Sequence, residues 1–317
     1  MKSYLASSIS RRKFAGISGG FAASFVASTA ASQDAATSPG WIDAHVHVWS
    51  PDVAKYPLAA KFQTSDMQPP SFTPEELLTH CRPAGVERIV LIQMSFYEFD
   101  HRYMKEVMAA YPKVFSGVAL IDFRGADVAK RMKELALQGM RGFRLHSKGD
   151  AKDWVNDPGM ATLWRTAEEE RLAVCPLIDS ADLPYVDALC KKFPGTTVVV
   201  DHFARVGISG EIDPQRLSEL CRLARFPNVH VKTSAFYALG KKKPPYDDLG
   251  MMIRQVVDAF GPARLMWASD CPFQVQGEHS YDASISLIRD RLDFLSTSDK
   301  QWMLRGTAEK VFFSNER

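Results

Sequence analysis

The chain has 317 residues, of which 46% are hydrophobic and 24% charged, and its formal net charge is +2. These values agree with one soluble, globular, enzyme-sized domain. Residues 1–30 hold four basic side chains and no acid, so without them the formal net charge changes from +2 to −2. The charge therefore gives no support to a nucleic-acid partner.

Residues 1–31 have the features of a twin-arginine export signal. The segment Ser10-Arg11-Arg12-Lys13-Phe14 precedes a weakly apolar run, which ends in small residues at 28–31. The run is too short and too rich in Gly and Ser to span a bilayer. We therefore expect a periplasmic or other extracytoplasmic protein with no stable membrane insertion after cleavage. Residues 32–40 would be a flexible lead-in to a domain over 41–317.

From residue 41 onward, apolar strand-like runs alternate with helical stretches. Strands are expected at 42–48, 87–93, 115–121, 140–146, 172–178, 196–202, 229–234 and 264–269. Helices are expected at 74–81, 103–111, 126–137, 161–170, 183–192, 214–224, 246–260 and 298–312, with Asp182 and Asp213 as N-caps. Most of the strands are continuous apolar runs, which is typical of parallel strands that helices cover.

Eight successive strand–helix units predict an α/β fold, a distorted (β/α)8 TIM barrel with parallel inner strands. A doubly wound open sheet is the alternative, but a Gly-rich loop would normally follow its first strand. The long connection at 50–72, rich in Pro and aromatic residues, is expected to form a loop over the site. The five cysteines show no CxxC spacing, so we expect mostly buried thiols and no disulfide framework.

Four polar residues stand where barrel strands end. His45 and His47 lie two residues apart in the first strand, so they project to the same side. His202 ends the sixth strand and Asp270 follows the eighth, and the carboxyl ends of barrel strands share one face. Three imidazoles and a carboxylate suit one Zn²⁺, or a similar ion such as Mn²⁺. Taken singly, solvated edge histidines, a core histidine and a helix cap explain these residues equally well.

Further side chains are placed to reach a small-molecule substrate. Arg144 and Arg205 lie at the predicted mouth, where a guanidinium can bind a carboxylate through two hydrogen bonds. His146 and Tyr237 follow the fourth and seventh strands and are expected to contact substrate. Lys232 lies inside the seventh strand, where an inward-facing ammonium would need a buried carboxylate as its partner.

Several segments of the sequence resemble the metal-dependent amidohydrolase superfamily. They are IDAHVHVW at 42–49, RGFR at 141–144, VVVDHFAR at 198–205, VKTSAFY at 231–237, MWASDCPF at 266–273 and GTAEKVF at 306–312. The chain is most similar to the amidohydrolase-related branch, amidohydrolase 2, which contains 2-pyrone-4,6-dicarboxylate lactonase and sugar-lactone hydrolases. The superfamily's frequent Lys on strand four and His on strand five have no counterpart here, which implies at most one metal ion. Some members of the branch with similar histidines work without any metal.

The resemblance implies a hydrolase that opens a lactone of a carboxylated or polyhydroxylated small molecule. Asp270 would act as general base, while His45, His47 and His202, with one metal ion or none, would polarise the carbonyl group. A metal-dependent non-oxidative decarboxylase of an aromatic or unsaturated acid is the second interpretation. A non-catalytic binding barrel is the third, although a binder needs no base at Asp270. No GxSxG segment is present, which disfavours a serine esterase.

Overall fold

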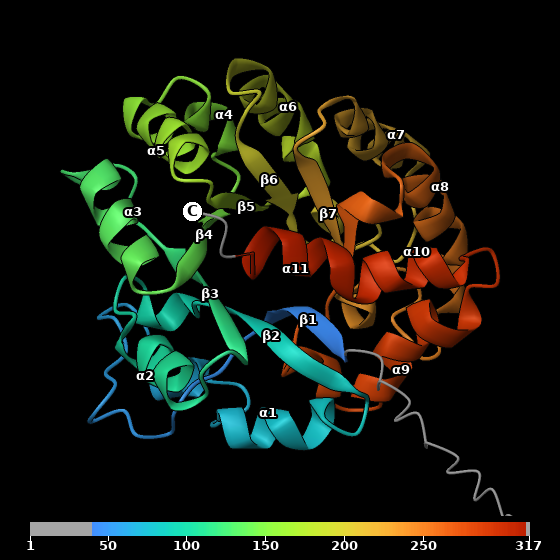
Figure 1. Ribbon diagram of the computed structural model, residues 1–317, viewed down its shortest axis with the longest axis horizontal. Helices are drawn as coiled ribbons and strands as arrows, with labels where there is room; N and C mark the ends of the chain where they lie inside the picture. Colours follow the sequence, from blue (N-terminus) through green and yellow to red (C-terminus); the bar gives the residue numbers. More distant parts are fainter. Residues whose placement is uncertain (1–39, 315–317) are drawn as a thin grey trace, which may run out of the picture. The chain divides into compact units, whose positions relative to one another are not determined.

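The computed structural model describes residues 40–314, so the predicted signal peptide and nearly all of the lead-in lie outside the described residues. Eight parallel strands form one sheet in the order of the sequence, and helices surround them (Figure 1). The strands are β1 (Trp41–Val46), β2 (Val86–Ile92), β3 (Phe115–Leu120), β4 (Met140–His146), β5 (Ala173–Leu177), β6 (Thr197–Val200), β7 (Val229–Thr233) and β8 (Leu265–Trp267). The predicted barrel is confirmed.

Most of the helices lie where the sequence pattern predicted them. They are α1 (Pro74–Cys81), α2 (Arg102–Ala110), α3 (Val128–Leu137), α4 (Ala151–Trp154), α5 (Pro158–Glu169), α6 (Leu183–Lys192), α7 (Pro214–Arg222), α8 (Gly250–Phe260), α9 (Tyr281–Ser286), α10 (Thr297–Gln301) and α11 (Thr307–Phe312). The single helix expected at 298–312 is divided by a π-helical turn at Trp302–Gly306. Helices α4 and α9 were not expected.

The two expected N-caps have different outcomes. The Asp213 carboxylate accepts hydrogen bonds from the backbone N–H groups of Gln215 and Arg216, as an N-cap does. Asp182 occupies the position before α6, but its side chain makes no capping hydrogen bond. It instead accepts the hydroxyl of Ser147 at 2.6 Å, so Asp182 has the predicted N-cap position but not the hydrogen bond of a cap.

The amino-terminal end of the barrel is closed by α11, which crosses it in Figure 1. Phe312 and Ala308 of this helix pack into a buried cluster with residues of the barrel interior: Ile42, Ala44, Val90, Val118, Ala173, Cys175, Val199, Met266 and Ala268. The backbone carbonyl of Phe312 also accepts the Ser116 hydroxyl, near the start of β3. Because α11 seals this end, the opposite end is the one left open for a site.

The barrel closes between β8 and β1 through a small number of hydrogen bonds. The backbone N–H of Asp270 donates to the His45 carbonyl at 2.9 Å, and that of His47 donates to the Cys271 carbonyl at 2.8 Å. Below them, the buried Asp43 carboxylate accepts the backbone N–H of Ser269 at 2.9 Å. The closure thus places Asp270 directly beside the two histidines of the first strand.

The remaining expectations about the chain concern its thiols and membranes. All five cysteines are free, and four of them are buried, as expected. Within residues 40–314, none of the helices combines the length and the apolar character needed to cross a bilayer.

Candidate active site

A cavity of about 330 Å³ lies at the carboxyl ends of the strands. Its lining includes all but one of the predicted site residues: His47, Arg144, His146, His202, Arg205, Tyr237 and Asp270. The exception is His45, which is 0% exposed and lies beneath the cavity. Gln93, Ile208 and Phe273 also line it and were not expected from the sequence.

The long connection at 50–72 was expected to cover this cavity, and that prediction is wrong. None of its residues lines the cavity. Its ends are pinned by two hydrogen bonds between the backbones of Trp49 and Phe72, at 2.8 and 3.2 Å. Tyr56 within it stacks edge-on against Tyr103 of α2, with ring centres 4.8 Å apart. Tyr56 therefore packs against α2, while Phe72 packs against Trp49 and against His80 of α1.

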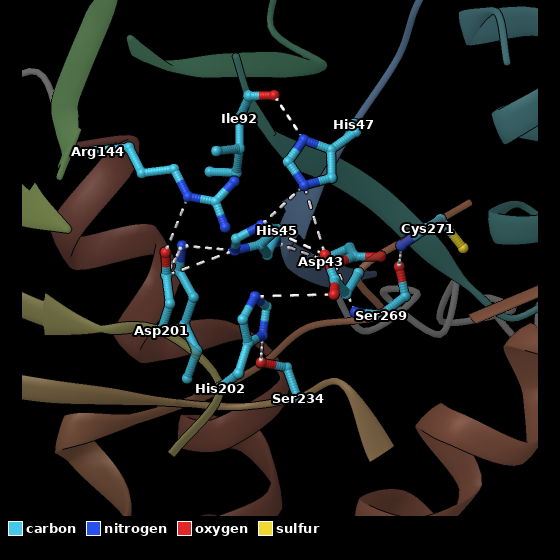
Figure 2. Close-up of polar contacts among 12 residues, drawn as sticks. Asp43, His45, His47, Ile92, Arg144, Asp201, His202, Ser234, Ser269 and Cys271 are labelled. Atoms are coloured by element: carbon cyan, nitrogen blue, oxygen red, sulfur yellow. Dashed lines mark hydrogen bonds and ion pairs between the residues drawn. The ribbon is translucent and has the colours of Figure 1, made fainter. Parts of the chain in front are cut away.

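The two histidines of the first strand meet through their ring nitrogens. His45 Nε2 lies 3.2 Å from His47 Nε2, as Figure 2 shows. His47 Nδ1 lies 2.9 Å from the carbonyl oxygen of Ile92 at the end of β2. A carbonyl only accepts, so His47 Nδ1 must carry a proton and donate it to this bond. The neutral His47 ring then has its lone pair on Nε2.

Asp270 lies beside both histidines and lines the cavity. Its Oδ1 is 3.4 Å from His45 Nε2 and 3.5 Å from His47 Nε2, and its Oδ2 accepts the Tyr237 hydroxyl at 2.7 Å. Oδ1 is buried and has no hydrogen-bond partner. Burial acts to raise the pKa of Asp270, but the adjacent His202, His47 and His45 outweigh it and hold that pKa below its usual value. Asp270 is therefore a carboxylate at neutral pH.

His202 lies in a left-handed turn that follows β6. Residues 202–205 all have positive φ, between 51° and 56°, which is uncommon for residues other than Gly. The turn brings both His202 and Arg205 to the cavity wall, whereas the sequence had suggested a strand that runs through His202. His202 Nδ1 lies 2.8 Å from the Ser234 hydroxyl, and Nε2 lies 3.7 Å from Asp270 Oδ2. Burial lowers the pKa of His202 to about 4, so the ring is neutral.

A buried ion pair lies on the far side of His45 from the cavity. Lys232 Nζ is 2.9 Å from Asp201 Oδ1, and both side chains are 0% exposed. Arg144 Nε approaches the other carboxylate oxygen of Asp201 at 3.4 Å (Figure 2). Burial acts to raise the pKa of Asp201, but Lys232 and Arg144 outweigh it and lower that pKa. The expectation that Lys232 needs a buried carboxylate is confirmed. The partner of Lys232 is Asp201, the residue that precedes His202 in the VVVDHFAR segment.

Two groups of residues bring possible metal ligands together. In His45, His47 and Asp270, and in His45, Asp201 and His202, the ligand atoms lie within 4.8 Å of one another. Both groups depend on His45, whose Nδ1 is 3.1 Å from Lys232 Nζ. An ammonium group can only donate, so His45 Nδ1 accepts and the ring proton lies on Nε2. The donor set has the composition of a zinc site. With Nδ1 accepting from Lys232 and the proton on Nε2, however, neither ring nitrogen of His45 has a lone pair left to bind an ion.

Comparisons with known proteins agree with this fold and show the family. The profile of the amidohydrolase family, amidohydrolase 2, matches residues 42–313. L-fucono-1,5-lactonase of Burkholderia ambifaria is 29% identical over 246 residues, which cover 76% of this chain and 83% of that protein. The 2-pyrone-4,6-dicarboxylate hydrolase of Comamonas testosteroni is 25% identical, with 77% and 80% covered. A zinc-bound Burkholderia multivorans amidohydrolase superimposes with a TM-score of 0.73 at 23% identity, covering 86% of this chain and 98% of that one.

Proposed function

The chain belongs to the amidohydrolase family, and from that premise we propose that it is a hydrolase that opens the ring of a small lactone. Relatives named for lactone hydrolysis support the reaction class. The observation that carries the proposal is Asp270 Oδ1, a buried carboxylate oxygen at the cavity with no hydrogen-bond partner. Buried polar atoms normally have a partner, and a water molecule in the cavity supplies the donor that the protein lacks here.

In the proposed mechanism, Asp270 activates that water. The water oxygen attacks the lactone carbonyl carbon while Oδ1 takes its proton, and the resulting intermediate then breaks the ring C–O bond. The same carboxyl group returns the proton to the leaving alkoxide, so the product is the open hydroxy acid. The Tyr237 hydroxyl donates to Oδ2, so we assign the proton transfer to Oδ1, the carboxylate oxygen without a hydrogen-bond partner.

Charge that develops on the carbonyl oxygen needs donors from the cavity wall. Arg144 lines the cavity and always carries N–H donors, of which Nε approaches Asp201 at 3.4 Å without a hydrogen bond. His202 Nε2 can also donate when Nδ1 accepts the Ser234 hydroxyl. One such donor is worth about 3 kcal/mol of transition-state stabilisation. We therefore assign carbonyl polarisation to Arg144 and His202, and an indirect role to His45, which does not line the cavity.

The cavity wall favours a lactone that carries an anionic group. Arg144, which is 9% exposed, and Arg205 both line the cavity, and Arg205 is held by Asp179 at 3.1 Å. Guanidinium groups bind carboxylates through paired, charge-assisted hydrogen bonds. A carboxylated lactone is thus our first choice of substrate, and a polyhydroxylated lactone is the second.

One bound zinc or manganese ion remains the alternative to a metal-free centre. The zinc-bound structure from Burkholderia multivorans shows that a protein of this fold holds zinc. In the present chain, binding through His45 would require its Nδ1 to leave Lys232. We therefore derive no catalytic step through an ion.

The test is a product assay at constant pH with two lactones, 2-pyrone-4,6-dicarboxylate and L-fucono-1,5-lactone, each corrected for spontaneous hydrolysis. We expect base uptake that matches substrate loss, faster for the dicarboxylate, with no CO₂. Release of CO₂ from an aromatic acid without base uptake would instead support the decarboxylase interpretation. Binding without turnover of any lactone in a wider panel would support the binding barrel.

A further inference from the structure

We infer that Lys232, which does not reach the cavity, is a positioning residue that sets the direction of the hydrogen bonds through His45 and His47 and thereby leaves Asp270 Oδ1 free for water. The inference concerns the centre of the proposed lactonase, and its role in catalysis rests on that proposed function. It is carried by four contacts around the two histidines, which Figure 2 shows in part.

The first contact fixes His45. Lys232 is fully buried and paired with the Asp201 carboxylate at 2.9 Å, so it is held as an ammonium group. Its Nζ lies 3.1 Å from His45 Nδ1. An ammonium group has three donors and no lone pair, so His45 Nδ1 can only be an acceptor. The proton of the neutral imidazole is therefore on Nε2.

The next contacts link the protonated Nε2 of His45 to His47. The nearer acceptor for His45 Nε2–H is His47 Nε2, at 3.2 Å, while Asp270 Oδ1 lies at 3.4 Å. His47 Nε2 is free to accept, because His47 Nδ1–H donates to the Ile92 carbonyl at 2.9 Å. The result is one directed chain from Lys232 through His45 and His47 to a backbone carbonyl. Its first member can only donate and its last can only accept, so its direction cannot reverse.

The direction of this chain of hydrogen bonds determines whether Asp270, the proposed base, receives a hydrogen bond from it. The chain ends on Ile92 and not on Asp270, and Oδ1 is indeed the carboxylate oxygen that lacks a partner. In the opposite tautomer, His45 Nδ1–H would face Asp201 Oδ1 at 3.5 Å. His45 Nε2 would then present a lone pair to two other lone-pair atoms, His47 Nε2 and Asp270 Oδ1. Three converging lone pairs form a cation site, so Lys232 selects a water-holding centre over a metal-holding one.

The first test uses the wild-type protein and no substrate. Long-range ¹H–¹⁵N spectra of the imidazole rings distinguish a protonated ring nitrogen from an unprotonated one, and a His45→Gln sample assigns the signals. We expect His45 to be protonated at Nε2 and unprotonated at Nδ1, in protein stripped of metal by a chelator. Protonation of His45 at Nδ1 would overturn the inference, whatever lactones the protein hydrolyses.

The second test removes the ion pair as a unit. The double variant Lys232→Met/Asp201→Asn removes both charges of this pair, and Lys232→Arg alone is its matched control because a guanidinium keeps a cation that can only donate beside Asp201. In the double variant we expect a His45 ring protonated at Nδ1 and zinc binding at least about tenfold tighter, measured by competition with a chromophoric chelator. The control should keep the wild-type tautomer and zinc affinity.

Turnover gives a further readout on the lactone that the wild-type protein hydrolyses. For the metal-free double variant, we expect kcat to fall by about tenfold or more, whereas the Lys232→Arg control, which keeps the contact between Asp201 and Arg144, should retain the wild-type kcat. A purely structural role would move neither the tautomer nor the zinc affinity. Wild-type values for tautomer, zinc affinity and kcat in a folded double variant would overturn the inference.

Discussion

Replacement of Asp270 by asparagine removes the proposed base while it preserves the local backbone. Asp270 has a φ of 65°, a conformation that asparagine adopts more readily than most residues, so Asn is a better substitute than Ala. The amide cannot take a proton from water, and the loss of a positioned general base costs about 10²- to 10⁴-fold in rate. KM should change little, because Arg144 and Arg205 still line the cavity.

The assay is base uptake at constant pH with the lactone that the wild-type protein hydrolyses, with substrate varied so that kcat and KM separate. Asp122→Asn is the matched control, because Asp122 is exposed and does not line the cavity. Thermal unfolding should show both variants folded, since an amide at position 270 no longer places a charged oxygen without a partner in a buried position. Wild-type kcat in Asp270→Asn would refute the assignment of this residue as the base.

Three further predictions follow from the same geometry. Tyr237→Phe loses a hydrogen bond to a carboxylate, worth about 1.5–3 kcal/mol, so kcat should fall by about 10- to 100-fold, and an unchanged kcat would exclude its role on Asp270. Arg205→Gln should raise KM for a carboxylated lactone by about tenfold or more and leave KM for a neutral lactone near its wild-type value, which paired kinetic assays compare. Burial lowers the pKa of His230 to about 4, so between pH 6.5 and 4 the unfolded chain binds a proton that the folded chain does not. Stability should therefore fall as pH falls through this window, by at most about 3 kcal/mol, and urea unfolding of His230→Gln should show a shallower slope.

The barrel could be predicted from the sequence because its signal is carried by local patterns. Runs such as Val198-Val199-Val200 are buried on both faces, and the caps and breaks between them mark the helices, so α1 and α6 were predicted with their observed bounds. The convergence of His47, His202 and Asp270 followed from the rule that parallel strands share a carboxyl end. These inferences need no knowledge of distant contacts.

The remaining features of the site could not be predicted, because they depend on side-chain directions that no local sequence pattern encodes. His202 looked like the end of a strand, but the chain leaves the sheet at Val200 and enters a left-handed turn. Tyr237 lines the cavity, as a contact with substrate requires, but the hydrogen bond from its hydroxyl to the Asp270 carboxylate could not be predicted. Lys232 clearly required an acid, yet the choice of Asp201 depended on which way that side chain turns from the adjacent strand.

The narrow closure between β8 and β1 has a consequence for how the protein acquires activity. Asp43 and Ser269 are 226 residues apart, so their contact is among the slowest kind to form in a folding chain. Most helices and neighbouring strands contact residues much nearer in sequence and can assemble earlier. During refolding, recovery of helical signal should therefore precede recovery of catalysis, because Asp270 reaches His47 only when the last strand docks against the first. Until then, β1 and β8 are both open sheet edges, which makes the half-closed barrel the state most prone to pair with another chain.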